Sequence, residues 1–112
     1  MNLEFSFTTA RDYHTIIFRG DMTVISSAPV SMELSKKIAA ESKKDYVLDL
    51  SGVKSIDSSG LRFIITLKEK IEEHNGQLSI LKPSKTVMKI LRETNMIKVL
   101  DIIKSYDTLK KQ

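Results

Sequence analysis

The chain has 112 residues, of which 41% are hydrophobic and 29% are charged, a composition that predicts one globular domain over residues 1–112. It contains no cysteine, which excludes disulfides, thiol nucleophiles and zinc sites built on cysteine. Its net charge of +4 arises in residues 57–112, which hold eleven basic and seven acidic residues. Because acids are interspersed there and aromatics make up only 6% of the chain, we favour solvated lysines over a nucleic-acid surface.

The first residues predict an antiparallel hairpin. Apolar and polar side chains alternate from Leu3 to Thr8, which indicates a half-buried strand. Residues 13–18 are rich in β-branched and aromatic side chains and end at Gly20, which indicates a second strand. Arg11-Asp12 supplies a polar turn between the two strands.

A helix follows. Ser26 and Ser27 offer caps, and Pro29 would lie in the first turn, where its missing N–H costs little. Apolar residues then recur at helical spacing to about Ser42: Val30, Leu34 and Ile38. Lys43-Lys44-Asp45 is the expected connector to the next strand.

The third predicted strand indicates how the sheet is covered. Tyr46, Leu48 and Leu50 face one side, whereas Val47 and Asp49 face the other. A sheet covered on both faces rarely carries an acid there, so we expect helices mainly on one face.

The second predicted helix begins near Ser58 and is the most apolar of the chain. Asn75-Gly76 ends it, with the glycine as a left-handed cap. Its buried stripe consists of Phe63, Ile64, Leu67 and Ile71, widened by Leu61 and Ile65.

A strand and a third helix come next. Residues 77–81 predict the strand, and Pro83-Ser84 opens the helix. Asn95 closes it, because asparagine tolerates a positive φ angle. The side chains at core spacing are Val87, Ile90 and Leu91.

The last segments complete the expected fold. Residues 99–103 predict a fifth strand, and residues 105–110 predict either a short helix or a frayed tail. The order β-β-α-β-α-β-α-β requires parallel crossovers, which are right-handed. The fold class is therefore α/β, a mixed and mostly parallel sheet with an N-terminal antiparallel hairpin and helices mainly on one face.

Residues typical of catalysis are sparse. The two histidines, His14 and His74, are far apart and have no metal-ligating companions at a useful spacing. No nucleophile elbow, phosphate loop or zinc-protease motif occurs. Asp49 and Asp57 lack a third ligand, which makes a small metal-dependent enzyme only a remote alternative. We therefore expect no enzymatic activity, no cofactor and no metal.

Residues 54–62, KSIDSSGLR, are the most informative stretch. Asp57 or Ser58 could cap the second helix, which is worth about 1 kcal/mol. A cap does not explain Gly60, which costs about 1 kcal/mol relative to alanine in a helix, nor Arg62, a cation at the positive end of the helix dipole. A small residue at this position indicates that another backbone approaches, and an exposed hydroxyl beside these groups is suited to accept a phosphoryl group.

Three stretches carry a family resemblance: YVLDLSGVKSIDSSGLRFIITLKEKIEEHNGQLSIL, VMKILRETNMIKVLDI and, more weakly, IIFRGDMTVISSAPVSMEL. Together they resemble a STAS domain, specifically a single-domain anti-sigma factor antagonist (anti-anti-sigma factor). The resemblance implies the STAS (SpoIIAA-like) fold. It also implies a non-catalytic regulator of transcription that binds an anti-sigma factor serine kinase and so frees a sigma factor.

The resemblance further implies a phosphorylation switch. The kinase would phosphorylate the first serine of the Asp-Ser-Ser-Gly motif, here Ser58, and a serine phosphatase would reverse the reaction. We expect the fold to survive, because a helix N-terminus favours anions. The implied partner-binding residues are Asp21, Thr23, Asp57, Ser59, Gly60, Leu61 and Arg62.

Some positions depart from the family pattern. Thr23 replaces a common Asp or Asn, so a hydroxyl takes the place of a carboxylate or amide beside the phosphorylation site. Arg62 replaces a common glycine and could neutralise phosphate on Ser58, reach nucleotide phosphates in the kinase, or be solvated. Thr94-Asn95 replaces a frequent Thr-Gly and preserves the helix stop.

Two expectations concern the setting of the protein. The sequence has no stretch near the roughly 20 apolar residues of a membrane span and no secretion signal at its N-terminus, so we expect a cytoplasmic location. The alternative function is that of a STAS scaffold in another complex, such as a sensory or lipid-transport assembly.

Overall fold

The computed structural model describes residues 3–10, 12–40 and 45–105, and only the backbone of residues 24–28. Strands and helices alternate in the predicted order. The strands are β1 (Leu3–Thr9), β2 (Tyr13–Met22), β3 (Asp45–Ile56), β4 (Leu78–Leu81) and β5 (Asp101–Ile103). The helices are α1 (Val24–Ala40), α2 (Ser58–Glu73), α3 (Lys85–Glu93) and a single 3₁₀ turn, η1 (Met96–Lys98). Within the described ranges, no helix has the length and apolar character needed to cross a membrane.

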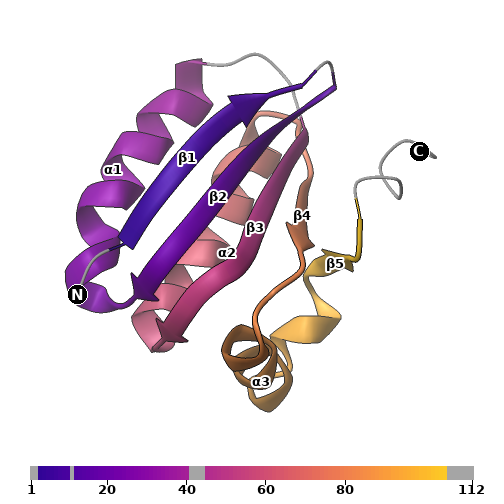
Figure 1. Cartoon of the computed structure of the whole chain (residues 1–112). Helices are drawn as coiled ribbons and strands as arrows, with labels where there is room; N and C mark the ends of the chain where they lie inside the picture. Colours follow the sequence, from indigo (N-terminus) through magenta and orange to yellow (C-terminus); the bar gives the residue numbers. More distant parts are fainter. Residues whose placement is uncertain (1–2, 11, 41–44, 106–112) are drawn as a thin grey trace.

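The five strands form one sheet in the order β1-β2-β3-β4-β5 (Figure 1). β1 pairs antiparallel with β2, with Leu3 opposite Gly20 and Thr9 opposite His14. All other neighbours pair in parallel. The predicted mixed sheet with an N-terminal hairpin is therefore confirmed, and the carboxyl ends of its parallel strands lie at one edge.

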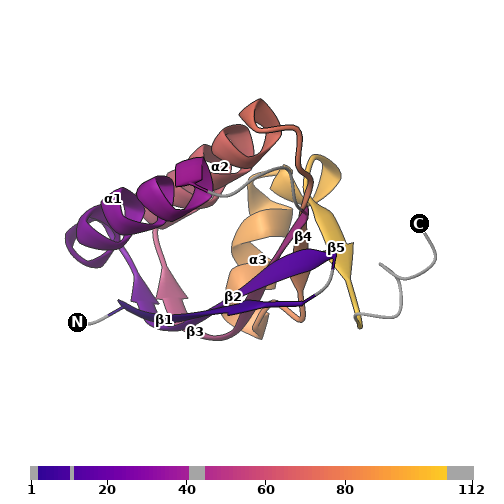
Figure 2. The ribbon, with the colours of Figure 1, turned by 90° about the horizontal axis from the view of Figure 1, so that it is seen from above.

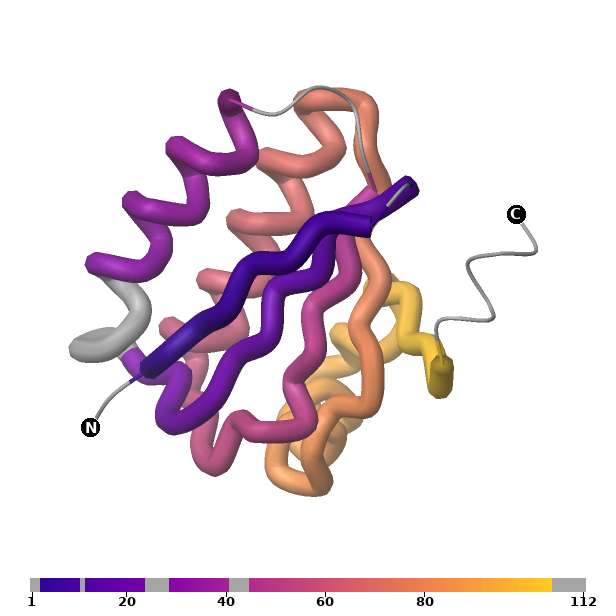
Figure 3. Tube along the Cα trace, turned by 45° about the horizontal axis from the view of Figure 1, so that its top comes forward, coloured from indigo at the N-terminus to yellow at the C-terminus, as the bar shows by residue number. Residues whose placement is uncertain are grey.

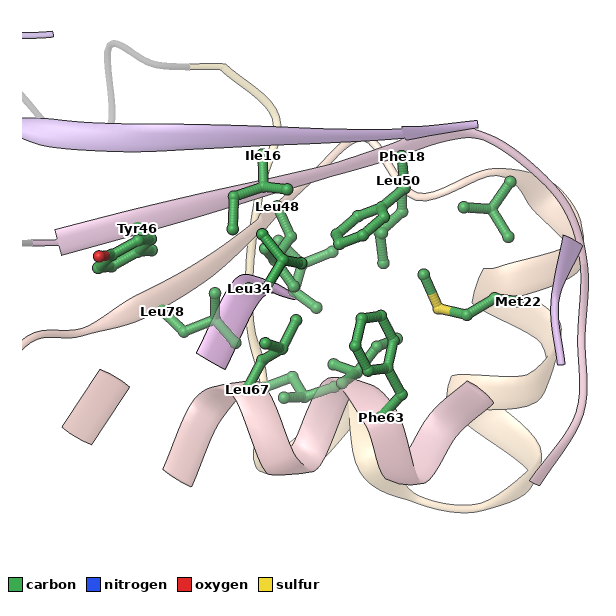
Figure 4. Packing of buried hydrophobic residues seen from close by; sticks show 14 of the residues in the cluster. Ile16, Phe18, Met22, Leu34, Tyr46, Leu48, Leu50, Phe63, Leu67 and Leu78 are labelled. Atoms are coloured by element: carbon green, nitrogen blue, oxygen red, sulfur yellow. The ribbon is translucent and has the colours of Figure 1, made fainter. Parts of the chain in front are cut away.

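Helices cover one face of this sheet, as predicted (Figure 2). The core lies between them and the strands. Phe18 of β2 meets Phe63 of α2 edge to face, with ring centroids 5.7 Å apart, and Met22 lies beside them (Figure 4). The other fully buried large side chains are Ile16, Leu34, Ile38, Leu48, Leu50, Ile64, Leu67, Ile71, Ile80 and Leu91.

The predicted start of the first helix is wrong. α1 begins at Val24, one residue after the end of β2, so Pro29 lies inside the helix rather than in its first turn. The side chains of Ser26 and Ser27, the predicted caps, lie outside what the structure describes. So do residues 41–44, which include the predicted helix end, and residues 11 and 106–112, with most of the predicted final segment.

The turn after α2 also differs from the prediction. Asn75, with φ of 65°, takes the left-handed conformation that we expected of Gly76. The side chain of asparagine can bond locally and so tolerates this region. Gly76 is instead buried, and its N–H donates to the carbonyl of Ile71 over 3.0 Å.

The predicted strand over residues 99–103 is too long. Asn95 closes α3 in the left-handed conformation, as predicted, but η1 follows at once. The N–H of Leu100 donates to the carbonyl of Met96 over 3.1 Å, so the β-branched Val99 lies in a turn and is exposed. Pairing with β4 begins only at Asp101.

Other bounds differ less. β3 runs to Ile56, beyond the alternating residues 46–50, because its second half keeps pairing with β2. In α3, Val87 and Leu91 are buried as predicted, whereas Ile90 is only half-buried.

Candidate functional site

The candidate site lies at the edge of the sheet where β2 and β3 end side by side (Figure 3). Met22 and Ile56, the last residues of these strands, are register partners. The N–H of Asp57 donates to the carbonyl of Met22 over 3.3 Å. The junction between β3 and α2 therefore packs against the connection from β2 to α1.

Asp57 is the N-cap of α2. Its backbone is extended, and its Oδ1 atom accepts a hydrogen bond from the N–H of Gly60 over 2.9 Å. Its carbonyl accepts the N–H of Leu61 over 3.0 Å, which begins the helical hydrogen bonding. Of the two candidates for the cap, the structure thus selects Asp57 and not Ser58.

Ser58 is the first residue of α2, and it is exposed. Within the described ranges, its hydroxyl has no hydrogen-bond partner. A hydroxyl at this position lies at the end of the helix where unpaired N–H groups and the helix dipole favour negative charge. Ser58 is therefore accessible to another protein, and an anion attached to it would lie in a favourable field.

Gly60 is buried, and the structure explains why it is a glycine. A Cβ atom at this position would lie 2.0 Å from the carbonyl oxygen of Met22 and 2.9 Å from Cγ1 of Ile56. The backbone that approaches Gly60 is therefore that of the same chain. Gly60 shapes the site by letting α2 pack against the end of β2, and it offers little surface itself.

Asp21 and Ser55 connect the two strands beside the site. They are register partners, and the hydroxyl of Ser55 donates to Oδ1 of Asp21 over 2.5 Å. Thr23 follows β2 directly and is half-buried. We did not predict Ser55, because its pairing with Asp21 depends on a strand register that no local pattern reveals.

The rest of the predicted site follows the first turns of α2. Ser59 and Leu61 are half-buried, and Leu61 packs against the core, whereas Arg62 is exposed. Because residues four apart share a helix face, Arg62 lies on the same side of α2 as Ser58. The structure thus brings all the predicted site residues to one end of α2 and the adjoining end of β2.

The structure separates the two carboxylates of the remote metal-site alternative. Asp49 accepts hydrogen bonds at Oδ1 from the backbone N–H and the hydroxyl of Ser51, over 3.0 and 2.7 Å. Asp57 lies eight residues further on, roughly 25 Å along an extended strand. Among the described residues, no group of three potential ligands is placed to hold a metal ion.

The histidines lie away from this edge. His14 is buried, with ring centroids 5.0 Å from those of both Phe7 and Tyr46, and its Nδ1 is 2.9 Å from the hydroxyl oxygen of Thr9. His74 caps the end of α2, with Nδ1 2.9 Å from the carbonyl of Lys70. These contacts are structural.

An α/β domain with an exposed serine at the start of its second helix is the arrangement that we expected from the resemblance. The chain belongs to the STAS domain family, whose sequence model matches residues 7–111.

Two curated relatives illustrate the range of this family. The chain is 24% identical over 102 residues to an anti-sigma F factor antagonist of Paenibacillus polymyxa, covering 91% of this chain and 87% of the relative. It is 33% identical over 66 residues to a probable sulfate transporter 3.4 of Arabidopsis thaliana, covering 59% of this chain. The chain spans only 10% of the length of that transporter.

Solved structures share the fold. A putative anti-sigma factor antagonist of Thermotoga maritima superposes with a TM-score of 0.84 at 19% identity, covering 96% of this chain and 92% of the other. The antagonist SpoIIAA in its unphosphorylated form gives a TM-score of 0.79 at 16% identity, covering 96% and 95%. Its phosphorylated form, from Bacillus, gives a TM-score of 0.70 at 16% identity, covering 96% and 98%.

Proposed function

We propose that this STAS domain is an anti-sigma factor antagonist without enzymatic activity. In its unphosphorylated form it binds an anti-sigma factor that is a serine kinase, which frees the sigma factor. Phosphorylation of Ser58 ends the binding, and a serine phosphatase restores it. The relative from Paenibacillus polymyxa supports the general function. The observation that carries the switch is the exposed hydroxyl of Ser58, which has no partner among the described residues.

The chemistry of the switch is a phosphoryl transfer. The kinase passes the γ-phosphoryl group of ATP to Oγ of Ser58, the hydroxyl loses its proton, and ADP leaves. The product carries about −1.5 to −2 charges at pH 7. The dipole of α2 stabilises this charge and Asp57 opposes it, so we expect the fold to persist while the docking surface is lost.

The proposed docking surface surrounds Ser58. Asp21 and Thr23 contribute from the end of β2, and Ser59, Leu61 and Arg62 contribute from α2. Arg62 lies one turn from Ser58 on the same helix face, which supports the first of its three predicted roles, charge compensation for the phosphate.

A pair of substitutions at Ser58 tests this function. Ser58→Ala should bind the anti-sigma factor and resist phosphorylation, whereas Ser58→Asp should bind at least about tenfold more weakly, because the charge is placed inside the interface. Isothermal calorimetry with the cognate kinase would measure the affinities, and mass spectrometry after incubation with ATP would locate the phosphate.

Thr8→Asp is the matched control, since it adds the same charge at an exposed hydroxyl on β1. The free energy of unfolding of Ser58→Asp should lie within about 1 kcal/mol of that of the wild type. Phosphate on another residue, or an affinity of Ser58→Asp equal to that of the control, would refute the switch.

The relationship to a sulfate transporter favours a second candidate, a STAS domain that regulates a transport assembly. This alternative predicts that affinity purification recovers a membrane transporter, with equal yield from wild type and Ser58→Asp. Recovery of a kinase, lost in Ser58→Asp, would favour the antagonist.

A further inference from the structure

The outer face of α3 carries a groove that the proposed switch does not use. The groove has a volume of about 570 Å³ and is lined by Pro83, Lys85, Met88, Lys89, Arg92 and Glu93. Five of these residues belong to α3, at the spacing of a single helix face. The opposite face of the helix sends Val87 and Leu91 into the core.

The net positive charge of the chain equals that of the groove and its flanks. Residues 82–98 contain five basic residues and one acidic residue, Glu93, whereas the rest of the chain contains thirteen of each sign. The net charge of +4 is therefore that of one short segment.

The cations of the groove have no acidic partner among the described residues. Lys85, Lys89 and Arg92 are exposed, and in the part of the chain that the structure describes no carboxylate forms an ion pair with them. Lys85 and Lys89 are one turn apart and repel each other. Lys85 is also the first residue of α3, at the positive end of the helix dipole, where a cation is unfavourable. An anionic ligand would relieve both effects.

Between the cations lies an apolar surface. Pro83 and Met88 are half-buried, and Met88 packs against the core at its inner side. Methionine adapts its shape to a bound apolar side chain. The groove thus combines three basic side chains and one acidic side chain, Glu93, with the apolar Pro83 and Met88. This surface is complementary to acidic side chains that flank an apolar one.

We propose that the α3 groove is a docking site for an acidic segment of a protein partner, one that presents carboxylates beside an apolar side chain. The lining favours this occupant. A hollow of about 570 Å³ has room for a few side chains. None of its lining residues is aromatic, so single-stranded bases would lack a stacking platform.

Fluorescence anisotropy with a labelled helical peptide of glutamates and leucines would test the proposal. Wild type should bind the peptide in a saturable, salt-sensitive manner and should not bind a matched peptide of lysines and leucines. The triple variant Lys85→Glu, Lys89→Glu, Arg92→Glu should lose at least about tenfold in affinity, and Met88→Ser, which keeps every charge, about fivefold.

The matched control is the triple variant Lys36→Glu, Lys54→Glu, Lys104→Glu, which makes the same charge change at exposed lysines elsewhere. This control variant should retain most of the affinity for the acidic peptide. Ser58→Asp should retain it too, because the groove is distinct from the switch surface. Circular dichroism would verify folding, and the neutral pair Lys89→Gln, Arg92→Gln provides a milder groove variant.

Three results would overturn the proposal. The first is an equal loss in the groove and control variants, which would indicate general charge attraction. The second is a loss in Ser58→Asp, which would place the peptide at the switch surface. The third is tighter binding of duplex DNA, or of phosphatidylserine vesicles, than of the acidic peptide, which would assign the cations to a nucleic acid or a membrane.

Discussion

Gly60 is disfavoured by helix propensity and required by packing. It lies in the first turn of α2, where its Cα approaches the Met22 carbonyl too closely for any side chain. Asp57 holds the same turn from the other side through its hydrogen bond to the Gly60 N–H. These two residues anchor the start of α2 and thereby keep Ser58 exposed between them.

The substitution Gly60→Ala separates the two effects. Propensity alone predicts that alanine stabilises the helix by about 1 kcal/mol. The steric conflict with backbone atoms predicts the opposite, a loss of about 1–3 kcal/mol or more in the free energy of unfolding. Urea denaturation would show whether the substitution raises or lowers the free energy of unfolding.

Gly52→Ala is the control for Gly60→Ala. Its Cβ would meet Cγ of Arg19 at 2.9 Å and the carbonyl oxygen of Phe18 at 3.1 Å, a milder backbone conflict than the 2.0 Å contact at Gly60. We therefore expect Gly52→Ala to be the less destabilising of the two variants. If Gly60→Ala proved as stable as the wild type, the close packing of α2 on β2 would be refuted.

At the scale of elements, two asparagines end helices. Asn75 follows α2 and Asn95 follows α3, and both have φ angles near that of the left-handed helix, 65° and 62°. After Asn75 the chain enters β4 within three residues, whereas after Asn95 it reaches β5 only at Asp101. In the second case the turn leads into η1, which shortens β5.

Substitution of Asn75 tests this role. Asn75→Gly should leave stability nearly unchanged, because glycine adopts positive φ without strain. Asn75→Ala should lower the free energy of unfolding by about 1–2 kcal/mol, the cost of the left-handed region for a residue with a Cβ. Asn75 is exposed, so thermal or urea unfolding would report the backbone effect alone. Equal stability of Asn75→Gly and Asn75→Ala would contradict a left-handed backbone conformation at this position.

At the scale of the molecule, stability depends on a core that lies between one face of the sheet and its helices. α2 provides the centre of this core, with Phe63, Ile64, Leu67 and Ile71 buried along one stripe. The candidate site, at the end of β2 and the start of α2, borders this core. Its position therefore depends on how well α2 packs.

Leu67→Ala should destabilise the whole domain. Leu67 is fully buried, and truncation of such a leucine costs about 2–5 kcal/mol through lost burial and a residual cavity. Ile65→Ala, on the half-buried flank of the same helix, should cost less. Equal denaturation midpoints for the two variants would contradict a core centred on α2.

Local pattern was sufficient for much of this structure. The order of elements, the hairpin, the coverage of one sheet face and the start of α2 at Ser58 follow from side-chain periodicity and from capping residues, which act over a few positions. Errors arose where two local signals compete. Pro29 favours a helix start, but α1 begins five residues earlier; the apolar residues after Asn95 favour a strand, but they begin with the turn η1.

The arrangement of the site was visible only in the folded chain. The contact between Gly60 and Met22, and the hydrogen bond between Ser55 and Asp21, join residues more than thirty positions apart. Strand register determines such contacts, and register results from the packing of the entire sheet. Sequence could thus identify Ser58 as a candidate, but its exposure depended on how α2 packs against β2.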